Sequence, residues 1–129
     1  MLDPVKTISI FQKTPDPKTF KAGETIFEAG QTGDAMYGII EGEVNMVVNA
    51  KVIETLTKGK LFGEGALIHD DHKRASTAIA KTDCQLAYLP KLEFLFAVQE
   101  TPEFALQVMR NYSDRLRQAR ETLSSLSDF

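Results

Sequence analysis

A carboxylate and a guanidinium stand ten residues apart in the middle of the chain, and small residues flank both. Glu64 lies between two glycines, and Arg74 is followed by Ala75 and Ser76. An ionised carboxylate accepts hydrogen bonds from hydroxyl groups, and a guanidinium can bind two phosphate oxygens at once. The pair therefore suits a small molecule that carries a hydroxyl group close to a single phosphate.

Several ordered motifs surround this pair. Phe62-Gly63-Glu64 and Arg74-Ala75-Ser76 resemble the phosphate-binding cassette of cyclic-nucleotide-binding domains. This family includes bacterial catabolite activators, regulatory subunits of cyclic-AMP-dependent protein kinase, and cyclic-nucleotide-gated channels. Upstream, the segments 20–27, 30–37 and 39–44 resemble the family's entry strands and its next hairpin. The resemblance extends from about Phe11 to the last helix.

The resemblance implies the ligand and the role of each site residue. We expect Glu64 to bind the ribose hydroxyl and Arg74 to pair with the cyclic phosphate. Backbone amides of the small residues should complete a cradle for the phosphate. No cofactor and no catalysis are expected. The candidate ligand-binding residues are Gly63, Glu64, Gly65, Ala66, Leu67, Arg74, Ala75 and Ser76.

Three positions depart from the family pattern. Gly65 stands where the family usually has Leu or Met, which removes an apolar contact to the ligand. The helix position at which bacterial activators offer a hydroxyl group to the purine aligns near Ala119 and Arg120. Ala75 follows the arginine where relatives selective for cyclic GMP usually have Thr. Cyclic AMP is therefore the favoured ligand, with cyclic GMP as the second candidate.

Length and composition fit one small globular domain over residues 1–129. Hydrophobic residues form 43% of the 129, which excludes a disordered chain. Fifteen basic against eighteen acidic residues give a net charge of −3, so we expect neither nucleic acid nor a membrane surface as a partner. The single cysteine, Cys84, excludes an internal disulfide and fits a reducing, cytoplasmic location. No signal peptide or membrane-spanning run is evident.

The first two-thirds of the chain has the pattern of short strands. Runs rich in Val, Ile, Phe and Tyr alternate with Gly and Asp turns, as in a sandwich or barrel. The runs that predict strands are Met36–Ile40, Glu43–Val48, Lys51–Leu56, Thr77–Lys81 and Cys84–Leu89. The resemblance implies a double-stranded β-helix, a β-roll of the jelly-roll type, over about residues 11–90.

After Pro90 the pattern becomes helical, and C-terminal helices are predicted over about residues 91–126. Leu92, Leu95 and Phe96 indicate a short helix. Thr101-Pro102 then predicts the start of a long helix without Gly or Pro. The fold class is therefore mainly β with a short and a long helix at the C-terminus.

The long helix carries a heptad stripe, defined by Ala105, Met109, Tyr112, Leu116, Ala119, Leu123 and Leu126. The family resemblance points the same way, because this helix forms the dimer interface in bacterial activators. We therefore predict a homodimer through the stripe, with Arg115 and Arg120 flanking it where like charges could face each other. The alternative is that the stripe only packs on its own β-roll.

Simpler interpretations exist for the singled-out residues. Glu64 could merely cap a short helical turn, and Arg74 could be a solvated loop arginine. His69 and His72 are three residues apart but lack a third defined metal ligand, so a metal site is not predicted. A small β-roll metal enzyme is therefore the weakest alternative.

The functional prediction is a cyclic-nucleotide sensor whose C-terminal helices signal to an effector protein, here unknown, or by dimerisation. We recognise no DNA-reading element in residues 1–129, and the charges of the long helix balance, so DNA is not expected as a partner. The alternative is a structural or protein-interaction module of the same fold that no longer binds a nucleotide. Gly65 and Ala119 are the features that favour this alternative.

Overall fold

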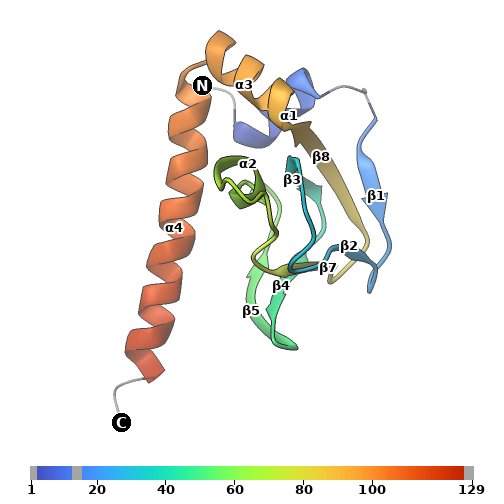
Figure 1. Cartoon of the computed structure of the whole chain (residues 1–129). Coiled ribbons are helices and arrows are strands. Elements are labelled where there is room, and N and C mark those ends of the chain that lie inside the picture. The colour runs from blue at the N-terminus through green and yellow to red at the C-terminus, as the bar shows by residue number, and fades with distance from the viewer. Residues whose placement is uncertain (1–2, 13–15, 127–129) are drawn as a thin grey trace.

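The strand-rich part of the chain forms two four-stranded antiparallel sheets that face each other in a roll (Figure 1). A computed structural model describes residues 3–12 and 16–126. The first sheet has the order β1-β8-β3-β6 and the second β2-β7-β4-β5. The strands are β1 (Lys18–Phe20), β2 (Thr25–Phe27), β3 (Ala35–Glu41), β4 (Val44–Val48), β5 (Lys51–Leu56), β6 (Leu61–Phe62), β7 (Thr77–Ala80) and β8 (Cys84–Pro90).

Four helices complete the fold. The first three are α1 (Pro4–Phe11), α2 (Gly65–Ile68) and α3 (Lys91–Glu100). The long helix α4 (Glu103–Leu126) runs beside the roll, and its C-terminal half extends along β4 and β5 (Figure 1). No helix within the described ranges is both long and apolar enough to cross a membrane.

Alternation along β3 and β8 divides the apolar residues into two clusters. Tyr37 and Ile39 point into the roll, whereas Met36 points to the other face, where the helices pack. On β8, Leu86 and Leu89 divide in the same way. The two clusters therefore share the same pair of strands, and the helices are fixed to the sheet that carries the cassette strand β6.

The five predicted strands and both predicted C-terminal helices are confirmed. Their bounds agree within about two residues, and α4 begins at Glu103, two residues after Thr101. Helix α1 is an addition to the predicted elements. Its start has a clear local cause, since the side chain of Asp3 accepts a hydrogen bond from the Lys6 N–H and Pro4 is the first helical residue.

Helix α4 has two different faces. Phe104 and Val108 are buried against the roll. The larger side chains of the heptad stripe remain 45% to 67% exposed: Met109, Tyr112, Leu116, Leu123 and Leu126. The stripe is therefore mostly exposed in the single chain, whereas a neighbouring face of the helix carries the buried contacts.

Candidate functional site

Glu64 lies at the junction between β6 and α2, and its side chain is buried. The residue is 4% exposed and is the N-cap residue of α2, yet its side chain makes no capping hydrogen bond. Oε1 accepts a hydrogen bond from Arg115 at 3.3 Å. Oε2 is buried and has no hydrogen-bond partner among the described residues. Helix capping therefore does not explain this carboxylate.

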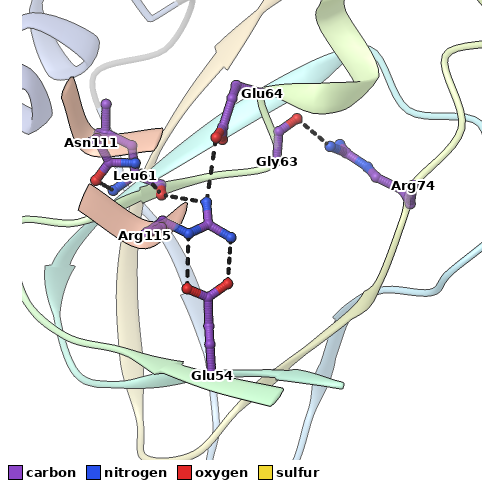
Figure 2. Close-up of polar contacts among 7 residues, drawn as sticks. All are labelled: Glu54, Leu61, Gly63, Glu64, Arg74, Asn111 and Arg115. Carbon is purple, nitrogen blue, oxygen red and sulfur yellow. Dashed lines mark hydrogen bonds and ion pairs between the residues drawn. The ribbon is translucent and has the colours of Figure 1, made fainter. Parts of the chain in front are cut away.

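Arg74 is also buried, at 7% exposed, so it is not a solvated loop arginine. Its two terminal nitrogens donate hydrogen bonds to the carbonyls of Gly63 and Ala35, each at 2.7 Å. The guanidinium carbon lies 4.1 Å from the centre of the Phe27 ring, within the range of a cation–π contact. The Gly63 bond places the guanidinium beside the residue that precedes Glu64 (Figure 2).

Two glycines form the slot that holds the Arg74 side chain. A Cβ atom at Gly33 would lie 2.3 Å from Nε of Arg74, and one at Gly63 would lie 2.9 Å from a terminal nitrogen. Gly63 also has a φ of +83°, which disfavours other residues. The sequence around the cassette therefore needs glycine at these positions in order to bring the guanidinium against the backbone.

Arg115 on α4 lies between two carboxylates (Figure 2). Its Nε and one terminal nitrogen donate to the two oxygens of Glu54, at 3.0 Å and 2.6 Å. The other terminal nitrogen donates to Glu64 Oε1 and to the Leu61 carbonyl, both at 3.3 Å. This bidentate contact with Glu54 is the geometry in which an arginine is most firmly oriented. Arg115, which flanks the predicted dimer seam, is therefore already paired with two carboxylates of its own chain.

The electrostatics of the site leave Glu64 poorly stabilised as an anion. Burial raises the pKa of its carboxyl, because the charged form loses hydration, and the nearby charge of Arg115 opposes that rise. Burial also lowers the pKa of Arg74. Burial alone would lower the pKa of Arg115, but the hydrogen bonds that it donates to Glu54 and the charge of Glu64 outweigh burial, so the pKa is raised overall. A hydroxyl donor at Oε2 would stabilise the ionised form of Glu64.

The remaining cassette residues lie in α2 and just after Arg74. Ala66 and Leu67 are buried, Ala75 is exposed and Ser76 is partly buried. The Leu67 N–H already donates to the Glu64 carbonyl at 2.9 Å, and the Leu67 side chain is buried in the apolar cluster under the helices. The Ala66 carbonyl contacts the His72 ring at 3.0 Å, which ties α2 to the loop that leads to Arg74.

An open groove of about 1120 Å³ lies between β5 and the C-terminal half of α4. Glu54 and Leu56 line it from the sheet, and Arg115 and Ala119 line it from the helix. Because Arg115 reaches from this groove to Glu64, the groove adjoins the cassette. Ala119, which the family resemblance places near the purine, therefore lies on the wall of the groove.

Sequence reasoning missed the roles of Glu54, Asn111 and Arg115. The signal that could have revealed the two helix residues is a second stripe, Phe104, Val108, Asn111 and Arg115, with the same 4-3-4 spacing as the heptad stripe. Two of its four members are polar, so a search for a stripe of apolar residues does not find it. Glu54 had no such signal, because its role depends on a contact with Arg115, 61 residues later.

No group of three or more His, Cys, Asp or Glu residues within 3–12 and 16–126 is arranged to hold a metal ion. The polar groups that the structure brings together are instead two carboxylates and two guanidiniums. Such groups recognise hydroxyl and phosphate groups of a ligand directly.

The fold and the site together define a β-roll with a buried carboxylate and guanidinium in one cassette, held against a C-terminal helix. The chain belongs to the cyclic nucleotide-binding domain family, whose model matches residues 17–101, more than half of the chain. The match includes every strand and α3. Domains of this family are regulatory rather than catalytic.

Relatives occur in larger signalling proteins. The chain is 42% identical over 69 residues to the cGMP-dependent protein kinase of Plasmodium berghei, covering 52% of this chain and 8% of the kinase. It is 43% identical over 76 residues to the cAMP-dependent protein kinase regulatory subunit of Schizosaccharomyces pombe, covering 58% of this chain and 18% of that subunit. The chain thus spans less than a fifth of either relative.

A solved structure extends the likeness to α4. The catabolite activator protein of Thermus thermophilus superposes with a TM-score of 0.77 and 26% identity, over 98% of this chain and 60% of that chain. The antiparallel roll and its C-terminal helices are therefore shared with that protein.

Proposed function

We propose that this domain binds a cyclic nucleotide, with cyclic AMP preferred over cyclic GMP, and does not turn it over. Glu64 accepts a hydrogen bond from the ribose 2′-hydroxyl, and Arg74 pairs with the cyclic phosphate. Backbone amides around Ala66, Ala75 and Ser76 supply further donors to the phosphate. Gly63 and Gly65 let the backbone approach the ligand closely.

The observation that supports this proposal best is the unpartnered Oε2 of Glu64. A buried carboxylate oxygen without a hydrogen bond is costly, and Oε2 has no partner among the described residues. A ligand hydroxyl at this position removes the cost. The same side chain already receives Arg115 at Oε1, so the carboxylate is oriented before the ligand arrives.

Arg74 is compatible with phosphate binding although backbone carbonyls hold it. A guanidinium has five N–H donors in a planar fork, and the bonds to Gly63 and Ala35 use one donor on each terminal nitrogen. Those bonds fix its plane, which favours a pre-organised site. The adjacent groove gives a purine room beside Ala119, and Ala75 favours adenine as the family resemblance implies.

A ribose test separates this function from a ligand-free module. Isothermal titration calorimetry with cyclic AMP and 2′-deoxy cyclic AMP should show that the wild type binds the deoxy analogue about ten- to a hundredfold more weakly. Glu64→Ala should bind both ligands weakly and with similar affinity. The matched control is Glu28→Ala, which removes an exposed carboxylate outside the site and should keep the preference for the hydroxyl.

Each result decides between named alternatives. Equal affinity of the wild type for both ligands would refute the role of Glu64 in ribose binding. No binding of either nucleotide at high micromolar concentration would favour the interaction module, the second candidate function, which the exposed stripe on α4 supports.

The signal would leave the domain through α4. Arg115 connects this helix to the cassette, so a ligand that engages Glu64 changes the contacts of the helix. We propose that the recipient is a second copy of the chain or an effector protein in the cytosol. Amide exchange that slows along α4 as well as around Glu64 on addition of cyclic AMP would support this route.

A further inference from the structure

A side-chain amide on α4 pairs with the main chain of the strand that leads into the cassette. Asn111 Nδ2 donates to the Leu61 carbonyl at 3.0 Å, and the Leu61 N–H donates to Asn111 Oδ1 at 3.1 Å. One amide thus takes both hydrogen bonds that a neighbouring strand would make. Leu61 begins β6, which lies at the edge of its sheet, so Asn111 acts as a one-residue strand partner (Figure 2).

This pairing fixes the position of α4 relative to the cassette. Leu61 stands three residues before Glu64, and Asn111 stands four residues before Arg115. Residues four apart on a helix lie on the same face. Because Asn111 is bound to Leu61, the helix position one turn later, Arg115, lies beside Glu64.

A second restraint acts on the far side of the guanidinium. Glu54 accepts hydrogen bonds from Nε and one terminal nitrogen of Arg115, so the other terminal nitrogen faces Leu61 and Glu64. Glu54 orients the guanidinium plane but lies on a different sheet from β6. Glu54 therefore cannot fix the position of α4 along β6. The pairing of Asn111 with Leu61 fixes that position.

We propose that Asn111 is a positioning residue of the nucleotide site. It holds β6 and α4 in register, so that Arg115 contacts Oε1 of Glu64 and Oε2 is left for the ribose hydroxyl. This inference rests on the proposed function. If Asn111 only stabilised the fold by pairing the edge of β6, its removal would weaken the binding of all ligands by the same factor.

The first test measures ribose discrimination, the ratio of the affinities for cyclic AMP and 2′-deoxy cyclic AMP. Asn111→Ala should lower this ratio by about tenfold, towards the ratio of Arg115→Ala. The double variant should show no further fall, because both changes remove the same arrangement. Ser113→Ala, an exposed residue of the same turn, should leave the ratio unchanged. Equal weakening of both ligands by Asn111→Ala would overturn the proposal.

The second test needs no ligand. Carbon NMR titration of the Glu64 carboxyl should show its pKa rising in Asn111→Ala in the same direction as in Arg115→Ala, since Arg115 no longer stabilises the anion. Glu54 and Arg74, the other charged groups that act on Glu64, stay in place in both variants. An unchanged Glu64 titration in folded Asn111→Ala would refute the positioning role.

The two tests separate the two proposals. A wild type that binds neither nucleotide refutes the proposed function, and the Glu64 titration still decides whether Asn111 positions Arg115. If Asn111→Ala does not fold, Asn111→Ser is the variant to measure, because its shorter hydroxyl side chain cannot make the two-bond contact but leaves a polar group at the edge of β6.

Discussion

Arg74 combines two tasks in one side chain. It donates to two backbone carbonyls and lies over an aromatic ring, which makes it part of the core of the roll. Its proposed ligand, a cyclic phosphate, uses the donors that these contacts leave. Structural and binding roles are therefore coupled at this residue, and both should respond to substitution.

Arg74→Lys should weaken cyclic AMP binding nearly as much as Arg74→Ala, by about 2–5 kcal/mol, because an ammonium lacks the planar fork. Both variants should also unfold more easily, since the Gly63 and Ala35 carbonyls lose donors, at ~1–3 kcal/mol each. Calorimetric titration well below the melting temperature and urea unfolding separate the two losses. Lys73→Ala, at the exposed neighbouring position, is the control; wild-type affinity in Arg74→Ala would contradict the phosphate assignment.

At this scale the sequence predicted which residues the site uses but not how they are held. Glu64 and Arg74 were identifiable because motif and spacing are local properties of the chain. Their partners were not, since Glu54, Asn111 and Arg115 meet only after α4 docks on the roll. The buried state of Arg74 depends on Gly33, which lies in a different loop.

Among the elements, the β4–β5 hairpin contains an identifiable weak point. Asn49 and Ala50 form its two-residue turn, and both have positive φ, 51° and 62°. A two-residue turn with these angles prefers Asn-Gly. Asn tolerates the left-handed region, but Ala pays a steric cost there of about 1–2 kcal/mol.

Ala50→Gly should therefore stabilise the protein by about 0.5–1 kcal/mol, after the larger entropy of an unfolded glycine is subtracted. The free energy of unfolding in urea measures this change. Asn49→Gly is the matched control at the other turn position and should gain less. A loss of stability in Ala50→Gly would show that the turn does not strain Ala50.

The predictability of the elements follows their length. Strands of four to seven residues such as β3 and β8 are long enough to show in the sequence as apolar, β-branched and aromatic runs between turn residues. The two-residue strand β6 exists because β3 pairs with it, and no local pattern marks it. Helix α1 had a recognisable start at Asp3 and Pro4, so the information was present but was overlooked.

At the scale of the whole molecule, β3 and β8 contribute side chains to both apolar clusters. The cluster inside the roll and the cluster under the helices are therefore joined through these two strands. A shift of α4 should therefore alter the packing of β3 and β8, which also line the interior of the roll. A single domain over residues 1–129 stays a prediction.

The heptad stripe on α4 carries five large apolar side chains that are 45% to 67% exposed in the single chain. We expect a homodimer through it. Leu116→Glu should give a monomer in sedimentation equilibrium, because a charge inside a closed seam is left buried and unpaired. Leu116 is 45% exposed in the single chain, so the fold of the roll should persist.

Leu106→Glu provides the control for this prediction. Leu106 is 61% exposed on the same helix but lies one position off the stripe, so the same chemical change should leave the mass of the dimer unchanged. If Leu116→Glu instead lowers the melting temperature at constant mass, the stripe serves the single chain. A wild type that is already monomeric at high micromolar concentration would leave an effector protein as the partner of this face.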